Sequence, residues 1–126
     1  MFKVVPVDIY NTDVLVSIAQ TDEELYNSIG SEHFTKEDFE ECYNDWTMDA
    51  RVVYHPTKGF IIMRFRNIIE EHGIIAHEAF HAAYTLLDRV GMRCNYETEE
   101  AYAYLIGFLT NKIAEINYEL QASKTE

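Results

Sequence analysis

The fold that we expect for this chain depends on one stretch, Ile74-Ile75-Ala76-His77-Glu78-Ala79-Phe80-His81-Ala82-Ala83. Most of its residues are apolar, which is typical of a largely buried helix. His77 and His81 are four residues apart, so on a helix they lie on one face, about 5–6 Å apart at Cβ. Two imidazoles in that arrangement can bind one zinc ion, and Glu78 can reach a metal-bound water as a general base. The pattern H-E-x-x-H therefore predicts a catalytic zinc site.

A second interpretation of the same stretch is a core helix whose histidines make ordinary hydrogen bonds. Burying two imidazoles and a carboxylate without a metal or polar partners costs free energy. We therefore favour the metal site.

A catalytic zinc needs a third protein ligand and leaves a fourth position for water. Glu97, Glu99 and Glu100 follow the motif across a turn that contains Gly91. Successive helical residues are rotated by about 100°, so these carboxylates point in different directions. We choose Glu100, with Glu99 and then Glu97 as alternatives. Glu100 is in phase with small residues that would let two helices approach closely, namely Ala103, Gly107 and Ala114.

The rest of the second half also has helical periodicity. One helix is expected from about residue 67 to residue 90, with Gly73 as an alternative start. A final helix is expected from about residue 98 to residue 120, because apolar residues recur there at helical spacing. They are Tyr102, Leu105, Ile106, Leu109, Ile113, Ile116 and Leu120.

The first half contains β-rich runs and two short helices. The runs are residues 4–9, 14–18, 51–55 and 60–65, with turns expected at residues 11–13 and 56–59. Thr21 and Thr35 each precede acids in the manner of helix N-caps; the second helix would use the spacing of Phe39, Cys42, Tyr43 and Trp46.

Strands followed by helices predict an α+β domain over residues 1–126. We expect a small, mainly antiparallel sheet packed against the motif helix and the C-terminal helix. The strand at residues 60–65 is our candidate for an exposed edge that pairs with an extended peptide, and a plain core strand is the alternative.

Composition narrows the function classes. The chain has 126 residues, with 22 acidic against 10 basic residues and a formal net charge of −12. This balance disfavours nucleic acid as a ligand, and no apolar run approaches the roughly 20 residues that span a bilayer. The N-terminus lacks a signal-peptide pattern, and Cys42 and Cys94 have no CxxC partner. We therefore expect a cytoplasmic protein.

The sequence also resembles known zinc enzymes. An HExxH motif followed some 20 residues later by a glutamate on a second helix, as at Glu100, resembles the gluzincin group of zinc metallopeptidases. The segment at residues 74–113 is similar to small HExxH proteins of bacteriophages, in which a Glu-x-x-x-Tyr-Leu-x-Gly-like stretch follows the motif. The resemblance implies a minimal zincin-like domain, a Zn²⁺ cofactor and a phage or prophage origin, hence the host cytoplasm.

Three functions follow as hypotheses. The first is a zinc metallopeptidase with His77, His81 and Glu100 as ligands, Glu78 as the base, and a phage or host peptide or protein as substrate. The second is a zinc-containing binding or regulatory protein without turnover. The third is an acidic inhibitor of a host nucleic-acid enzyme, which the charge of −12 suggests.

Several other side chains have less specific signals. Tyr84, Tyr104 and His55 are candidates for an oxyanion donor, although packing or surface roles are the favoured interpretation. His33 and His72 lie in polar surroundings, and we expect them to be solvated.

Overall fold

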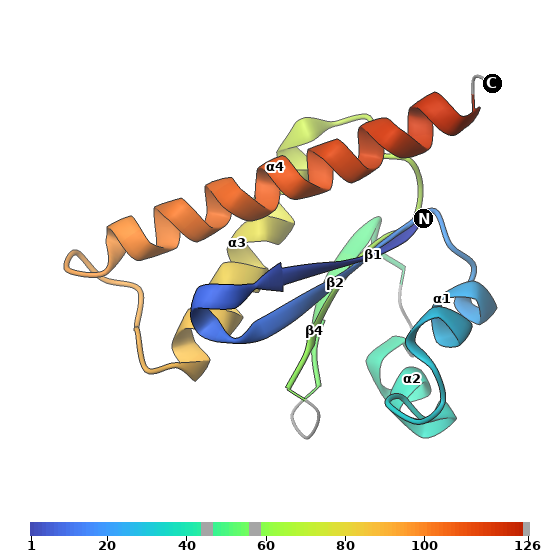
Figure 1. Cartoon of the computed structure of the whole chain (residues 1–126), viewed down its shortest axis with the longest axis horizontal. Helices are drawn as coiled ribbons and strands as arrows, with labels where there is room; N and C mark the ends of the chain where they lie inside the picture. The colour runs from blue at the N-terminus through green and yellow to red at the C-terminus, as the bar shows by residue number, and fades with distance from the viewer. Residues whose placement is uncertain (44–46, 56–58, 125–126) are drawn as a thin grey trace.

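Along the chain, two strands are followed by two α-helices, and this order then repeats (Figure 1). The computed structural model describes residues 1–43, 47–55 and 59–124. Its elements are β1 (Phe2–Val7), a 3₁₀ turn η1 (Asp8–Tyr10), β2 (Thr12–Ile18), α1 (Asp22–Ile29), α2 (Lys36–Tyr43), β3 (Ala50–Tyr54), β4 (Ile61–Phe65), α3 (His72–Arg89) and α4 (Glu99–Lys124). Trp46 and most of the expected turn at residues 56–59 lie outside the described residues.

The strands form one mixed sheet in the order β1-β2-β4-β3. β1 pairs antiparallel with β2, and β3 with β4, whereas β2 and β4 are parallel. The α+β class is therefore confirmed. The expectation that residues 60–65 form an edge strand is wrong, because β4 pairs on both sides and all five of its residues are buried. A run this apolar is stabilised by cover on both faces. The two edges of the sheet are formed by β1 and β3.

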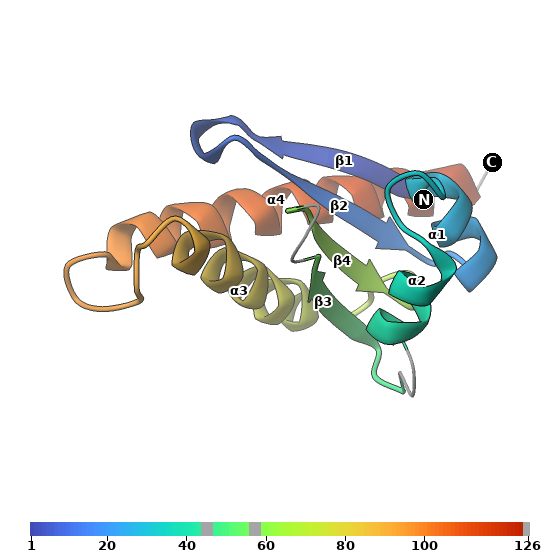
Figure 2. The same ribbon diagram turned by 90° about the horizontal axis from the view of Figure 1, so that it is seen from below.

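Helices cover both faces of the sheet (Figure 2). Ile61, Met63 and Phe65 of β4 belong to the core that includes α3 and α4. Ile62 points the other way and packs with Leu25, a residue of α1. Because successive strand residues face opposite sides, one strand holds the two helical layers against the sheet. The expected packing against α3 and α4 is confirmed, and α1 and α2 cover the second face.

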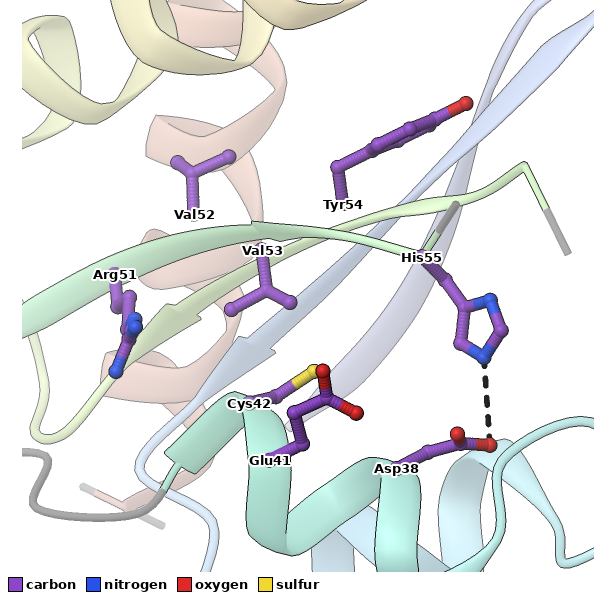
Figure 3. Close-up of a pocket in the computed structure, with 8 residues that line it drawn as sticks. All are labelled: Asp38, Glu41, Cys42, Arg51, Val52, Val53, Tyr54 and His55. Atoms are coloured by element: carbon purple, nitrogen blue, oxygen red, sulfur yellow. Dashed lines mark ion pairs between the residues drawn. The ribbon is translucent and has the colours of Figure 1, made fainter. Parts of the chain in front are cut away.

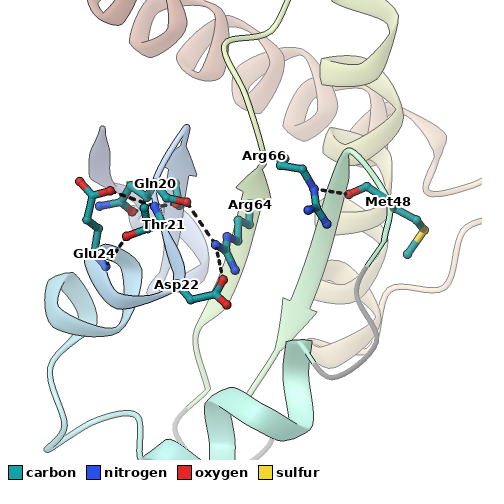
Figure 4. A network of polar contacts seen from close by, with 8 residues as sticks. Gln20, Thr21, Asp22, Glu24, Met48, Arg64 and Arg66 are labelled. Carbon is teal, nitrogen blue, oxygen red and sulfur yellow. Dashed lines mark hydrogen bonds and ion pairs between the residues drawn. The ribbon is translucent and has the colours of Figure 1, made fainter.

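Arg64 continues the alternation of β4 on the side of α1 and α2. Its Nη2 donates to Asp22 Oδ1 at 2.8 Å and to the Gln20 carbonyl at 3.2 Å (Figure 4). Its guanidinium lies 4.9 Å from the centre of the Tyr43 ring. A buried charge needs such partners, so Arg64 ties β4 to the start of α1.

The helices α3 and α4 pack against each other and form a hairpin (Figure 2). α3 begins at His72, close to the alternative start at Gly73. The segment before α3 is held by the buried side-chain amide of Asn117. Asn117 on α4 accepts from the Ile69 N–H at 2.9 Å and donates to the Ile69 carbonyl at 3.0 Å. Within the described residues, no helix is both long and apolar enough to cross a membrane.

Candidate metal centre

The helix α3 places the HExxH motif with one face in the core and the other outside. Ile75, Ala79 and Ala82 are buried, whereas His77 and His81 are exposed. The side chain of His77 keeps 68% of its accessible surface. The expectation of a largely buried helix is thus correct for one face only. Exposure leaves both imidazoles accessible to a metal ion and to a substrate.

The two imidazoles already point at one another. Their Nε2 atoms are 3.2 Å apart, and their ring centres are 4.9 Å apart. Two nitrogen ligands at about 2.1 Å from a tetrahedral zinc are separated by about 3.4 Å. At this distance the two imidazoles form a hydrogen bond, as the alternative interpretation expects. The same spacing also fits a shared zinc ion with little movement of either side chain.

Glu78 has a different environment from the two histidines, although it is their neighbour on the helix. It is 8% exposed, and its Oε1 lies 4.0 Å from His77 Nε2. Burial raises the pKa of Glu78, and the charges of His81 and His77 oppose that rise. A carboxylate beside two histidines, with its pKa raised by burial, has the properties of a general base.

The structure does not bring a third ligand to the pair. Glu97, Glu99 and Glu100 are all exposed, and the last two begin α4. Within the described residues, no group of three His, Cys, Asp or Glu side chains could hold a metal ion. Glu100 as the third ligand remains a prediction.

The reason for choosing Glu100 is wrong, because the small residues do not lie between the helices. Ala103, Gly107 and Ala114 are exposed, and a Cβ at Gly107 would meet nothing within 4 Å. The buried face of α4 instead consists of Tyr102, Leu105, Leu109, Ile113, Ile116, Asn117 and Leu120. Large apolar side chains bury more surface than alanine and glycine do, so they determine which face packs against α3.

A hollow of about 390 Å³ opens beside the motif. Its lining joins α3 and the segment that precedes it to the start of β3: Met48, Asp49, Ala50, Glu71, Gly73, Ile74, His77 and Glu78. Sequence reasoning missed the contribution of residues 48–50. The one signal was the lower apolar content of residues 51–55 compared with residues 60–65, which favours an edge position for β3 over β4.

The other candidate side chains lie elsewhere or on the surface. His55 is buried on the side of the sheet that faces α2, where its Nε2 lies 3.3 Å from Asp38 Oδ2 (Figure 3). Tyr84 and Tyr104 are 48% and 78% exposed. The favoured packing or surface interpretation therefore agrees with the structure for all three. His33 and His72 are exposed, as expected.

Comparisons of this chain with protein-family models, curated proteins and solved structures gave no match. The case for a function therefore comes from the geometry and chemistry of the site itself.

Proposed function

We propose that this protein is a zinc-dependent peptidase. The observation that carries the proposal is the 3.2 Å separation of His77 Nε2 and His81 Nε2 on the exposed face of α3. That spacing suits two ligands of one tetrahedral ion. Glu78, which follows His77 in the motif, is placed to act as the general base that hydrolysis requires.

In this proposal His77 and His81 would hold the metal, and Glu100 would supply the third ligand. Glu99 and Glu97 are the alternatives. Bound zinc would supply Lewis-acid chemistry, because it lowers the pKa of water towards about 7 and polarises a carbonyl.

In this proposal Glu78 transfers a proton from the attacking water to the leaving amine. Its carboxylate is shielded from bulk solvent and stands 4.0 Å from His77 Nε2, so it faces the space next to the ligands. There it would accept a proton from the attacking water and then donate that proton to the leaving amine. The raised pKa that burial produces favours the first step, because it makes the carboxylate a better base.

The substrate in this proposal is a peptide or protein segment in extended form. β3 is an edge strand, and its first residue, Ala50, lines the same hollow as His77 and Glu78. An edge strand offers unpaired backbone groups to an extended chain. β3 thus takes the place that we had expected for residues 60–65.

Metal binding is the first test. We expect one zinc per chain by elemental analysis after dialysis, and His77→Ala should abolish it. The matched control is His72→Ala, an exposed histidine on the same helix, which should keep the zinc. Glu100→Ala should weaken zinc affinity by about 10-fold or more, and Glu99→Ala and Glu97→Ala should change it little. Wild-type protein without metal would contradict the proposal.

Glu78→Gln is the second test, because glutamine keeps the shape of the side chain and removes the base. The variant should retain zinc and lose peptide hydrolysis by about 10²-fold or more. The measurement is a peptide-library digest read by mass spectrometry, with a chelator control. Hydrolysis that survives in Glu78→Gln would exclude this glutamate as the base. Zinc binding without any hydrolysis would instead favour a zinc-containing binding protein.

A further inference from the structure

The outward side of α3 lacks charged side chains over most of its length. Within the described residues 73–84, the exposed positions follow one side of the helix, which we call the outer face: Gly73, Ala76, His77, Phe80, His81 and Tyr84. None of these residues is Asp, Glu, Lys or Arg. Apolar residues on all sides of a helix are typical of one that is covered on all sides, whereas only the side of α3 that faces the sheet and α4 is covered here (Figure 2). The outer face therefore has the composition of a packing surface.

The aromatic residues of the outer face are spaced as in paired helices. Phe80 and Tyr84 are 41% and 48% exposed, and their ring centres are 6.0 Å apart. Along the outer face, Gly73, His77, Phe80 and Tyr84 are separated by four, three and four residues, like the contact positions of a coiled coil. A Cβ at Gly73 would meet no atom within 4 Å, so this end has room for a side chain of another molecule. The spacing favours a second helix against the outer face.

The histidine pair on the outer face is half of a closed zinc site. His77 Nε2 and His81 Nε2 lie 3.2 Å apart, and among the described residues no group of three His, Cys, Asp or Glu side chains could hold a metal ion. A zinc ion in a closed site has four protein ligands in a tetrahedron. Most homodimers have twofold symmetry, so an ion on the twofold axis receives the same two ligands from each copy. Two copies of this chain therefore supply all four ligands.

The charge distribution favours the same face for a contact between copies. Each copy has a formal net charge of −12, so two copies repel each other, and least where neither surface is charged. Acidic residues occupy the first turns of α1, α2 and α4, whereas the first turn of α3 has none. A Zn²⁺ ion at the centre of the contact offsets part of the repulsion. A basic partner, by contrast, would find no carboxylate on the outer face to pair with.

We propose that zinc joins two copies of this chain through their outer faces, with His77 and His81 of each copy as its four ligands. Phe80 and Tyr84 of each copy pack against the opposite helix beside the ion. The inference rests on the zinc site of the proposed function and adds a closed state of that site. Four imidazoles leave no position for water, so the zinc-bridged dimer is inactive. Zinc in excess over the chain gives each copy its own ion and returns the open state.

Sedimentation velocity of the full chain tests the inference without requiring turnover. Metal-free protein is titrated with zinc, and we expect monomer without zinc, dimer at half an equivalent, and monomer again when zinc exceeds the chain. Half an equivalent should lower the dissociation constant of the dimer by about 10²-fold or more, because the ion binds only the associated form with four ligands. X-ray absorption at the same ratio should show about four nitrogen neighbours at about 2.0–2.1 Å from zinc.

Two pairs of variants separate the metal from the face around it. His81→Ala should abolish the zinc-induced dimer, and the matched control His72→Ala, at an exposed histidine of the same helix, should keep it. Phe80→Lys puts like charges opposite each other, so it should weaken the dimer by about 10-fold or more while each chain still binds zinc. Tyr118→Lys adds the same charge at an exposed aromatic residue of α4 and should leave the dimer unchanged.

The outcomes distinguish this inference from the peptidase proposal. A chain that binds one zinc and stays monomeric at every ratio overturns the inference and leaves the peptidase standing. A dimer that forms equally without zinc, keeps one zinc per chain, or is unaffected by His81→Ala or Phe80→Lys also overturns the inference. A dimer at half an equivalent, with peptide hydrolysis only in the zinc-saturated monomer, supports both. The same dimer without hydrolysis at any ratio supports the inference and overturns the peptidase, and a chain that binds no zinc overturns both.

Discussion

At the scale of single residues, burial gives side chains that are neighbours in the sequence very different environments. His77 and Glu78 are neighbours, yet the histidine is exposed and the glutamate is nearly covered. In the proposed site, the exposed histidine can be reached by a metal ion, whereas the glutamate becomes a stronger base when water is removed from it. The turn of α3 that carries His77 and Glu78 lies at the edge of the core, so it leaves the histidine exposed and covers the glutamate.

The two cysteines also differ in their exposure to solvent. Cys42 is half-buried, and burial, with the nearby charge of Glu41, raises the pKa of its thiol to about 11, whereas Cys94 is exposed. Because the thiolate is the nucleophile, Cys42 should react much more slowly with iodoacetamide at about pH 8, and its rate should keep rising as the pH approaches 11. Peptide mapping by mass spectrometry measures both sites. Equal modification at pH 8 would contradict this assignment.

At the scale of elements, helix α4 determines how much of the motif helix is covered. Its buried face uses large apolar residues at helical spacing, and its small residues face outwards. The contact between α3 and α4 therefore depends on residues such as Leu105 and Leu109. The segment before α3 is fixed separately by the two hydrogen bonds of Asn117.

The exposed position of Gly107 leads to a stability prediction. Gly107→Ala should raise the free energy of unfolding by about 0.5–1 kcal/mol, because alanine favours helix and its Cβ meets no neighbour. Gly91→Ala is the control: Gly91 has φ +88°, where alanine is strained, so this variant should be less stable than wild type. Urea denaturation compares the two. A destabilised Gly107→Ala would mean that this glycine does lie at a close helix contact.

At the scale of the whole molecule, acidic charge dominates. The net charge of −12 is spread over a chain of 126 residues. Ion pairs such as Lys3 with Glu119 and Lys112 with Glu115 lie at the surface and contribute little to stability. The folded state therefore carries a net repulsion that an unfolded, expanded chain relieves.

Added salt should stabilise this protein. Increasing NaCl from about 0.01 M to about 0.2 M shortens the Debye length from roughly 30 Å to less than 10 Å and screens repulsion across the molecule. We expect Tm to rise by a few degrees in chelator-treated protein, measured by circular dichroism, with a neutral osmolyte at matched osmolality as the control. A Tm that falls with salt would show that favourable ion pairs outweigh the repulsion.

Local signals made the helices and the motif predictable. Thr21 and Glu24 form the capping box that begins α1, and Gly30 follows its end. The apolar spacing of α4 and the four-residue spacing of His77 and His81 depend only on helical geometry. The composition alone also indicated a strongly acidic molecule.

The tertiary structure decided everything that depends on residues far apart in the chain. Val14 pairs with Ile61 in parallel, which puts β4 in the centre and leaves β3 at the edge next to the motif. The same arrangement brings Asp49 to His77 and separates Glu100 from it. Periodicity reports which face of an element is apolar, but not which partner covers that face. That choice is set by the surface that all the elements bury together.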